Sequence, residues 1–163
     1  MKKFISLILS VVMLVSLFSF AFGITASADE KDYGIENTGI TYFVDSESGN
    51  DKNDGLSEKT AWKTLQNVNN TTFEAGSAIL LKRGCVWTDT FLWPKGSGDE
   101  ENINYISCYG DENEDLPYIS SIYDDSLDGL PPTDACVTIS TDQNYWEISN
   151  LSLYNGTNST GTQ

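Results

Sequence analysis

Residues 41–65 read TYFVDSESGNDKNDGLSEKTAWKTL, and the fold prediction starts from this stretch. Its first five residues, 41–45, are mostly β-branched or aromatic, which predicts a short strand. Residues 46–55 are rich in Ser, Asn, Asp and Gly, so a loop is expected there. A strand followed by a long polar loop therefore opens the folded part of the chain.

A short helix is predicted directly after this loop. Thr60 can cap it, because a hydroxyl accepts hydrogen bonds from the unpaired amides of a first turn. Trp62, Leu65 and Val68 recur at helical spacing and form a narrow apolar stripe over residues 61–68. The stripe predicts a helix that buries one face.

Beyond this helix the sequence predicts only short strands separated by turn residues. They are expected at 78–81, 86–87, 91–93, 103–107, 118–122, 136–140, 145–148 and 150–154. The run at 78–81 is apolar throughout, so it should be buried on both faces. This pattern indicates an all-β chain. A β-sandwich and a solenoid of parallel strands both fit it, because the repeat has no clean period.

Residues 1–28 have the features of a secretory signal peptide. Lys2 and Lys3 give a positive start, an almost wholly apolar run follows, and residues 25–28 (TASA) offer small side chains for cleavage. A transmembrane anchor is the alternative, since the run is nearly long enough to span a bilayer. Export is favoured, so we expect a secreted protein without a membrane segment after cleavage. Residues 29–39 are expected to be a polar linker and 40–163 the folded domain.

The charge balance excludes some partners. The chain has 24 acidic and 9 basic residues, a net charge of −15, and removal of the signal peptide would leave −17. A surface poor in Lys and Arg lacks the phosphate-neutralising groups on which nucleic-acid binding depends. Nucleic acid and anionic lipid are therefore not expected as partners. An acidic glycan would need a divalent cation as a bridge.

Three cysteines, Cys85, Cys108 and Cys136, cannot all pair within one chain. Each lies beside β-prone residues, so buried thiols in the core are the favoured interpretation. A Cys85–Cys108 disulfide is the alternative, which an exported protein permits.

Two acidic loops invite a calcium interpretation. Residues 51–55 offer closely spaced oxygens, but they depart from the EF-hand pattern, and an Asx-rich turn is favoured. Residues 111–115 are expected to be a solvated acidic turn.

Catalytic groups are not identifiable in the sequence. The loop carrying Asp124, Asp125 and Asp128 could overhang a groove, although nothing selects these carboxylates as a glycosidase pair. Lys82 and Arg83 could serve a lyase, but they more simply end a strand and meet neighbouring carboxylates. The chain has no His, which excludes His-based triads. No catalytic, cofactor-binding or metal-ligating residue is therefore assigned.

Several segments together resemble the first coils of secreted right-handed parallel β-helix proteins of the pectate-lyase-like superfamily. These segments are 42–45, 49–51, 53–55, 60–65, 76–84 and 145–151. The resemblance implies a right-handed parallel β-helix whose apolar first coil is capped by the helix at 61–68. Asn150 suits a corner between coils, where its amide can hydrogen-bond to a neighbouring coil.

The same resemblance implies a carbohydrate-active enzyme. It implies a polysaccharide lyase, in which case calcium is a possible cofactor, or a glycoside hydrolase with paired carboxylates. Catalytic residues are expected beyond residue 163, so this chain should be an inactive N-terminal portion. The alternative is a non-catalytic β-helix that binds glycans or acts as a surface adhesin.

Overall fold

The computed structural model describes residues 31–122 and 135–156. The predicted signal peptide and the loop with Asp124, Asp125 and Asp128 lie outside these ranges. By its internal contacts the chain divides into Met1–Asp32 and Tyr33–Gln163, and the fold below belongs to the second unit.

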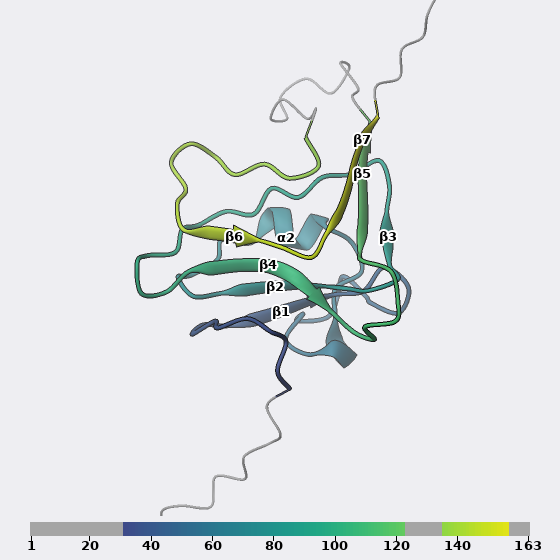
Figure 1. Ribbon diagram of the computed structural model, residues 1–163, viewed down its shortest axis with the longest axis horizontal. Coiled ribbons are helices and arrows are strands. Elements are labelled where there is room, and N and C mark those ends of the chain that lie inside the picture. The colour runs from purple at the N-terminus through teal and green to yellow at the C-terminus, as the bar shows by residue number, and fades with distance from the viewer. Residues whose placement is uncertain (1–30, 123–134, 157–163) are drawn as a thin grey trace, which may run out of the picture. The chain divides into compact units, whose positions relative to one another are not determined.

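Four strands form the first sheet, in the order β1-β2-β4-β6. Their bounds are β1 Thr41–Val44, β2 Ala78–Lys82, β4 Asn104–Tyr109 and β6 Trp146–Ile148. Each strand pairs in parallel with the next, and one row of the sheet runs Tyr42, Ile79, Ile106, Ile148. Figure 1 shows these strands stacked one above another.

A second, three-stranded sheet has the order β3-β5-β7. Its strands are β3 Val86–Trp87, β5 Tyr118–Ile122 and β7 Ser152–Gly156, again paired in parallel. Trp87, Ile119 and Leu153 share one row. From β2 onward the chain thus alternates between the two sheets, as Figure 1 shows.

All pairings among the described strands are parallel, so the molecule is a sheet-rich, nearly helix-free structure with open sheets. The antiparallel pairing that a β-sandwich requires is not found among these strands. Parallel neighbours in one sheet need long connections. The connection from β1 to β2 contains η1 and α2, and each later connection contributes a strand to the other sheet. The all-β prediction is confirmed.

Residues with left-handed backbone make the short connections between sheets. Gly84, with φ of 75°, lies between β2 and β3, and Asn150, with φ of 56°, lies between β6 and β7. Asn150 Nδ2 also donates to Ser107 Oγ on β4, 3.1 Å away. The predicted corner Asn therefore does bond to a neighbouring strand.

The helix predicted at 61–68 is wrong in its bounds. A 3-10 turn, η1 Glu58–Thr60, begins after Ser57, and a single α-helical turn, α2, spans Gln66–Asn70. Thr60 ends the first of these instead of capping a helix. Trp62 is extended instead of helical, because its backbone N–H donates to Phe43 O and its carbonyl accepts from Asp45 N.

This pairing covers the outer edge of β1. Phe43 N also donates to Gly55 O, so both sides of the β1 backbone are hydrogen-bonded. The predicted stripe Trp62, Leu65 and Val68 is buried, as expected, although only Val68 lies in a helix. The side chains of the stripe pack in the core, while the backbone of the loop hydrogen-bonds to the outer edge of β1.

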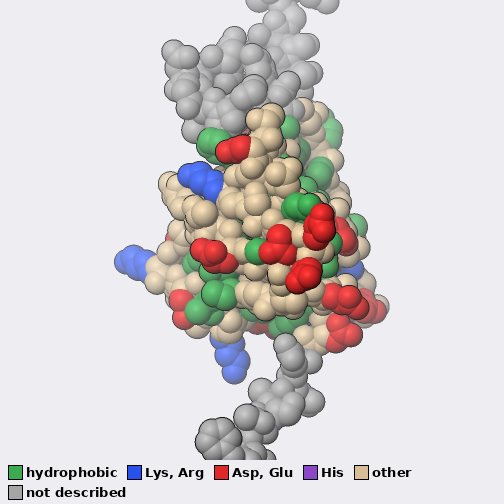
Figure 2. Space-filling model, turned by 90° about the vertical axis from the view of Figure 1, so that its left-hand side faces the viewer, with side chains coloured by type: hydrophobic (Ala, Val, Ile, Leu, Met, Phe, Trp, Pro, Cys, Tyr) green, Lys and Arg blue, Asp and Glu red, His purple; other side chains and the backbone are tan. Residues whose placement is uncertain are grey.

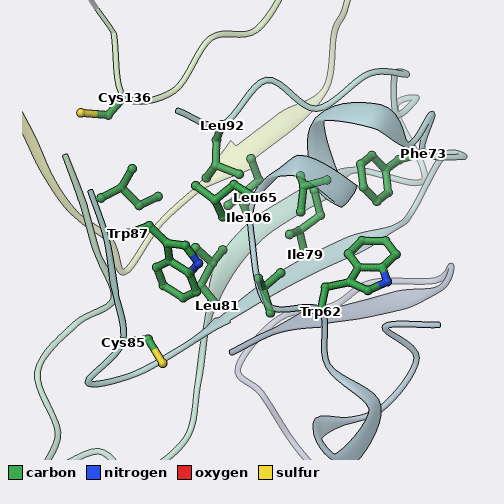
Figure 3. Packing of buried hydrophobic residues seen from close by; sticks show 13 residues of the cluster. Trp62, Leu65, Phe73, Ile79, Leu81, Cys85, Trp87, Leu92, Ile106 and Cys136 are labelled. Atoms are coloured by element: carbon green, nitrogen blue, oxygen red, sulfur yellow. The ribbon is translucent and has the colours of Figure 1, made fainter. Parts of the chain in front are cut away.

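The main core lies between the sheets. Figure 3 shows side chains from β2, β3, β4 and the loop segments converging there. The buried residues that form this core are at most 6% exposed, and they include Leu65, Ile79, Leu81, Trp87, Leu92 and Ile106. Burial of such side chains contributes about 1.5–3 kcal/mol each relative to exposure.

A smaller apolar cluster covers the other face of the first sheet. Phe43, Leu80 and Tyr109 form it, and Tyr33 and Ile35 from the expected linker pack against it. The rings of Tyr33 and Phe43 meet edge to face, with centroids 5.4 Å apart. Residues 78–81 are accordingly buried on both faces, as predicted.

Apolar side chains in both rows become more exposed at the last strands, β6 and β7. Ile79 and Ile106 are fully buried, whereas Ile148 in the same row is 39% exposed. In the second sheet, Ile119 is fully buried and its neighbour Leu153 is 48% exposed. Each inner strand is covered by the strand after it, whereas β6 and β7 have no following strand within residues 31–122 and 135–156, and their apolar side chains are partly exposed.

Candidate functional site

The loop at 51–55 uses its carboxylates and amides as backbone caps. Asp51 Oδ1 accepts from the amides of Lys63 (2.9 Å) and Thr64 (2.8 Å), and Asp51 Oδ2 accepts from the Thr64 hydroxyl. Asp54 Oδ1 accepts from Leu56 N at 3.0 Å. These oxygens organise the loop, which supports the predicted Asx-rich turn over a calcium site.

The acidic turn at 111–115 has the same construction. Asp111 Oδ1 accepts from the backbone amide of Asn113 and from its side-chain amide, at 2.9 and 2.8 Å. These bonds hold the pKa of Asp111 below its ordinary value. All five residues are exposed, so the segment is a solvated turn as predicted.

Asp45 is the one buried carboxylate among the described residues, and it forms an ion pair with Lys82. The Lys82 Nζ lies 2.7 Å from Asp45 Oδ2, and Oδ1 accepts from the amides of Glu47 and Ser48. Burial opposes the charge, but the bonds from Lys82 and these amides hold the pKa of Asp45 below its ordinary value. The predicted meeting of Lys82 with a carboxylate is confirmed. Arg83 instead donates to the Glu114 carbonyl oxygen, at 3.3 Å.

Asp45, Glu47 and Cys85 lie close enough together to suggest a metal site. The Cys85 Sγ is 3.5 Å from Asp45 Oδ1. However, the Lys82 ammonium already neutralises Asp45, and a divalent cation would have to displace it. This cluster therefore has the chemistry of a structural ion pair that joins β1 to β2.

All three cysteines are free and buried. The favoured prediction is thus confirmed, and the alternative Cys85–Cys108 bridge is wrong. Cys85 and Cys136 belong to the main core, where they pack as small apolar side chains.

A groove of about 400 Å³ lies between α2 and the segment at 90–95. Its lining combines two aromatic side chains, polar amide and hydroxyl side chains, and one lysine. The lining residues are Thr64, Gln66, Asn69, Asn70, Thr90, Phe91, Trp93 and Lys95. We call this the α2 groove.

Alternating burial places the aromatic side chains in the α2 groove. Leu92 and Pro94 are buried, while Phe91, Trp93 and Lys95 are half-buried. Side chains of an extended segment alternate between its faces, so residues 91, 93 and 95 share the outer face. Leu92 also forms an isolated parallel bridge with Val137, which holds this segment in place.

Hydrogen bonds fix the orientation of Trp93. Its backbone N donates to Asn69 Oδ1 at 2.7 Å, and its indole Nε1 donates to Ser140 Oγ at 3.0 Å. Asn69 Nδ2 donates in turn to Phe91 O, which ties α2 to the aromatic segment. The Lys95 Nζ stands 5.6 Å from the centroid of the Trp93 ring. The groove wall is therefore held rigidly before any ligand binds.

The α2 groove carries no carboxylate in its lining, although the chain has 24 Asp and Glu residues. Figure 2 shows, on one face of the molecule, how acidic side chains otherwise predominate over basic ones. The strand predicted at 91–93 is reduced to a single bridge at Leu92, and the groove was not predicted from the sequence. The alternation of Phe91, Leu92 and Trp93 was the available signal.

A second hollow, of about 480 Å³, lies beside β3, β5 and β7. Its lining includes Cys85, Val86, Asp115 and Tyr118. Its polar lining consists mainly of Asp115, Tyr118 and Ser152, so it offers fewer polar side chains to a ligand than the α2 groove does.

Within residues 31–122 and 135–156, helices of the length and apolar character needed to cross a bilayer do not occur.

The described part of the chain thus combines parallel sheets with a groove lined by polar and aromatic side chains and one lysine. The relatives found by comparison are GH136 lacto-N-biosidases, which are glycoside hydrolases. The chain is 33% identical over 116 residues to a lacto-N-biosidase of Bifidobacterium longum subsp. longum, covering 69% of this chain and 7% of that protein.

Crystal structures of a GH136 lacto-N-biosidase from Eubacterium ramulus also match. The selenomethionine derivative gives a TM-score of 0.62 at 31% identity, and the native protein gives 0.61 at 30%. The matches cover 77% and 76% of this chain but 22% of the crystallised chain. No protein-family model matches the sequence.

Proposed function

We propose that this chain forms the N-terminal coils of a secreted right-handed parallel β-helix glycosidase that acts on glycans. The observation that carries the proposal is the pair of parallel sheets between which the chain alternates, together with 30–33% identity to lacto-N-biosidases. A chain that visits the same sheets in the same order repeatedly is a solenoid in construction.

A hydrolase is favoured over a lyase. The relatives are glycoside hydrolases, whereas the pectate-lyase-like resemblance concerned architecture. Asp51 and Asp111 cap turns, and Asp45 pairs with Lys82. The paired carboxylates that glycoside hydrolysis needs are therefore expected on coils beyond residue 163.

Exposed apolar row positions on β6 and β7 support this arrangement. Ile148 and Leu153 stand where Ile106 and Ile119 are fully covered by the following strand. A further coil would cover them in the same way. The proposed substrate is an oligo- or polysaccharide outside the cell, and secretion rests on the predicted signal peptide at 1–28.

A non-catalytic glycan binder is the second candidate. The α2 groove favours it, because its lining can recognise a ligand but contains no carboxylate. The two candidates differ in whether bonds are broken.

The test compares two preparations on the same panel of neutral and acidic glycans. One is this chain, and the other is the secreted protein together with any coding sequence that follows residue 163. New reducing ends and unsaturated uronates are measured with and without a chelator. We expect the longer protein to release reducing ends without unsaturated products, and this chain to be inactive.

Unsaturated products that disappear with chelator would instead identify a calcium-dependent lyase. Absence of any product from the longer protein would favour the binder.

A further inference from the structure

We infer that the α2 groove is a binding site for a neutral glycan. The choice of glycans as the ligand class rests on the proposed function; the position and selectivity of the site rest on the groove itself. Its ligand would lie along residues 90–95 with α2 on the other side.

The aromatic side chains provide the first half of the argument. Phe91 and Trp93 lie two residues apart on the same face of an extended segment, so they are spaced by about 6.6 Å along the chain. The apolar faces of pyranose rings pack against such rings, which have an apolar body. Trp93 is held by the bonds to Asn69 and Ser140, so little order is lost when a sugar stacks there.

The polar side chains provide the second half. Gln66 and Asn70 are exposed in the groove lining and make no side-chain hydrogen bond within the described residues. Each amide can both donate and accept, as sugar hydroxyls require. Asn69, in contrast, is already used in fixing Trp93 and Phe91. Asn69 therefore has a structural role in the groove wall, whereas Gln66 and Asn70 are available to a ligand.

Charge selects the kind of glycan. The eight lining residues contain one lysine and no carboxylate, so a neutral ligand meets no repulsion in the groove. An acidic glycan would meet Lys95 but also the field of a chain with net charge −15. A single cation does not offset that repulsion, and neutral sugars are therefore the expected ligands.

The experiment measures binding of the purified chain to cello-, xylo- and chito-oligosaccharides, with oligogalacturonate as the acidic comparison. Titration calorimetry and tryptophan fluorescence provide the affinities. We expect at least one neutral series to bind and oligogalacturonate to bind at least about tenfold more weakly at low salt.

Two sets of variants locate the site. Trp93→Ala should weaken binding about tenfold or more, and Trp93→Phe less. Since Trp93→Ala also removes the bond to Ser140, the double variant Gln66→Ala/Asn70→Ala provides an independent test. It removes exposed side chains without internal bonds, so the melting temperature should stay unchanged while affinity falls about threefold or more.

Tyr145→Ala is the matched control, because Tyr145 is a 46% exposed aromatic residue outside the groove lining. Its affinity should equal that of the wild type. Absence of neutral-glycan binding by the wild type would overturn the inference. Binding that the groove variants leave unchanged would also overturn it, while the proposed glycosidase function would still be decided by release of reducing ends.

Discussion

At the residue scale, Asp45 shows how one buried charge is stabilised. Its side chain is 4% exposed, while that of Lys82 is 33% exposed, so the carboxylate is desolvated and the ammonium keeps contact with water. Four hydrogen bonds, from Lys82 Nζ, two amides and the Cys85 thiol, compensate for the lost hydration. The charge of Asp45 is therefore stabilised by Lys82 and Cys85, which lie 37 and 40 positions further along the chain.

Asp45→Asn should destabilise the protein by about 1–3 kcal/mol at neutral pH. The folded pKa of Asp45 is lowered, so its ionised form contributes stability above the unfolded pKa of about 3.9 and loses it as pH falls through the folded value. The difference between variant and wild type should consequently shrink below about pH 4. Urea unfolding measured across this pH range tests it, with Asp142→Asn as an exposed control. A difference that stays constant with pH would contradict the assignment.

Asn150 is the second residue whose local conformation has a distant partner. Its φ of 56° is unfavourable for most side chains, and its amide donates to Ser107 Oγ. Asn150→Ala should cost about 1–2 kcal/mol, because alanine tolerates this backbone poorly and cannot donate. Asn150→Gly should cost less than alanine, since glycine adopts positive φ freely. Chemical denaturation measures the loss of stability in each variant. An equal loss in both would mean that the positive φ of residue 150 does not contribute to the cost.

At the element scale, the loop at 46–65 acts as the edge partner of β1. Gly49 is essential to it, because a Cβ at this position would collide with the carbonyl oxygens of Trp62 and Asp45. Neither oxygen can move away, since each accepts a hydrogen bond that holds the loop or β1: Asp45 N donates to Trp62 O, and Gly49 N donates to Asp45 O.

Gly49→Ala should therefore separate the loop from β1 and destabilise the fold by about 2 kcal/mol or more. Hydrogen exchange should quicken at the amides of Phe43, Asp45 and Trp62, which bond across this edge. Ser48→Ala, a neighbouring exposed position, is the control. Unchanged protection at those three amides would show that the loop accommodates the extra carbon.

The strand rows give a second prediction for elements. Ile119→Ala should cost about 2–5 kcal/mol, because the side chain is fully buried and its loss leaves a cavity. Leu153→Ala, one strand further along the same row, should cost less than about 1 kcal/mol in this chain, since Leu153 is 48% exposed. Thermal and urea unfolding of both variants provide the comparison. Similar losses would contradict the view that β7 is uncovered.

At the scale of the whole molecule, the charge imbalance opposes compactness. A net charge of −15 on 163 residues creates repulsion that dissolved salt screens. The screening length shortens from about 30 Å at 0.01 M to about 8 Å at 0.15 M salt. Within the folded unit, the acidic side chains that repel one another lie mostly on exposed loops and turns. The main core and the lining of the α2 groove contain no carboxylate.

Raising the salt concentration over that range should increase the melting temperature by about 2–5 °C. The matched variant Glu101→Gln/Glu112→Gln/Asp142→Asn removes three exposed charges whose side chains make no hydrogen bond or ion pair with another described residue. It should melt higher than the wild type at low salt and respond less to added salt. Calorimetry at several sodium chloride concentrations measures both effects, and a melting temperature that falls with salt would contradict them.

Local patterns predicted the strands well where burial and turn residues agreed. The strand at 118–122 is confirmed by β5, and the apolar run at 78–81 lies within β2. The helix at 61–68 was wrong because Trp62, despite its helical spacing, gains backbone bonds to β1. The strand predicted at 136–140 is reduced to a single bridge at Val137.

The sequence alone determined that the chain is β-rich and acidic, and it marked Asn150 as a corner, because these properties follow from composition and from local backbone preference. Only the tertiary structure decided that strands 27 to 42 residues apart pair in parallel, that Asp45 meets Lys82, and that Phe91 and Trp93 face α2 across a groove without carboxylates. The physical reason is that these features depend on contacts between segments that are distant in the sequence. Strand pairing, burial and the electrostatic field at a site are fixed only when those segments pack together.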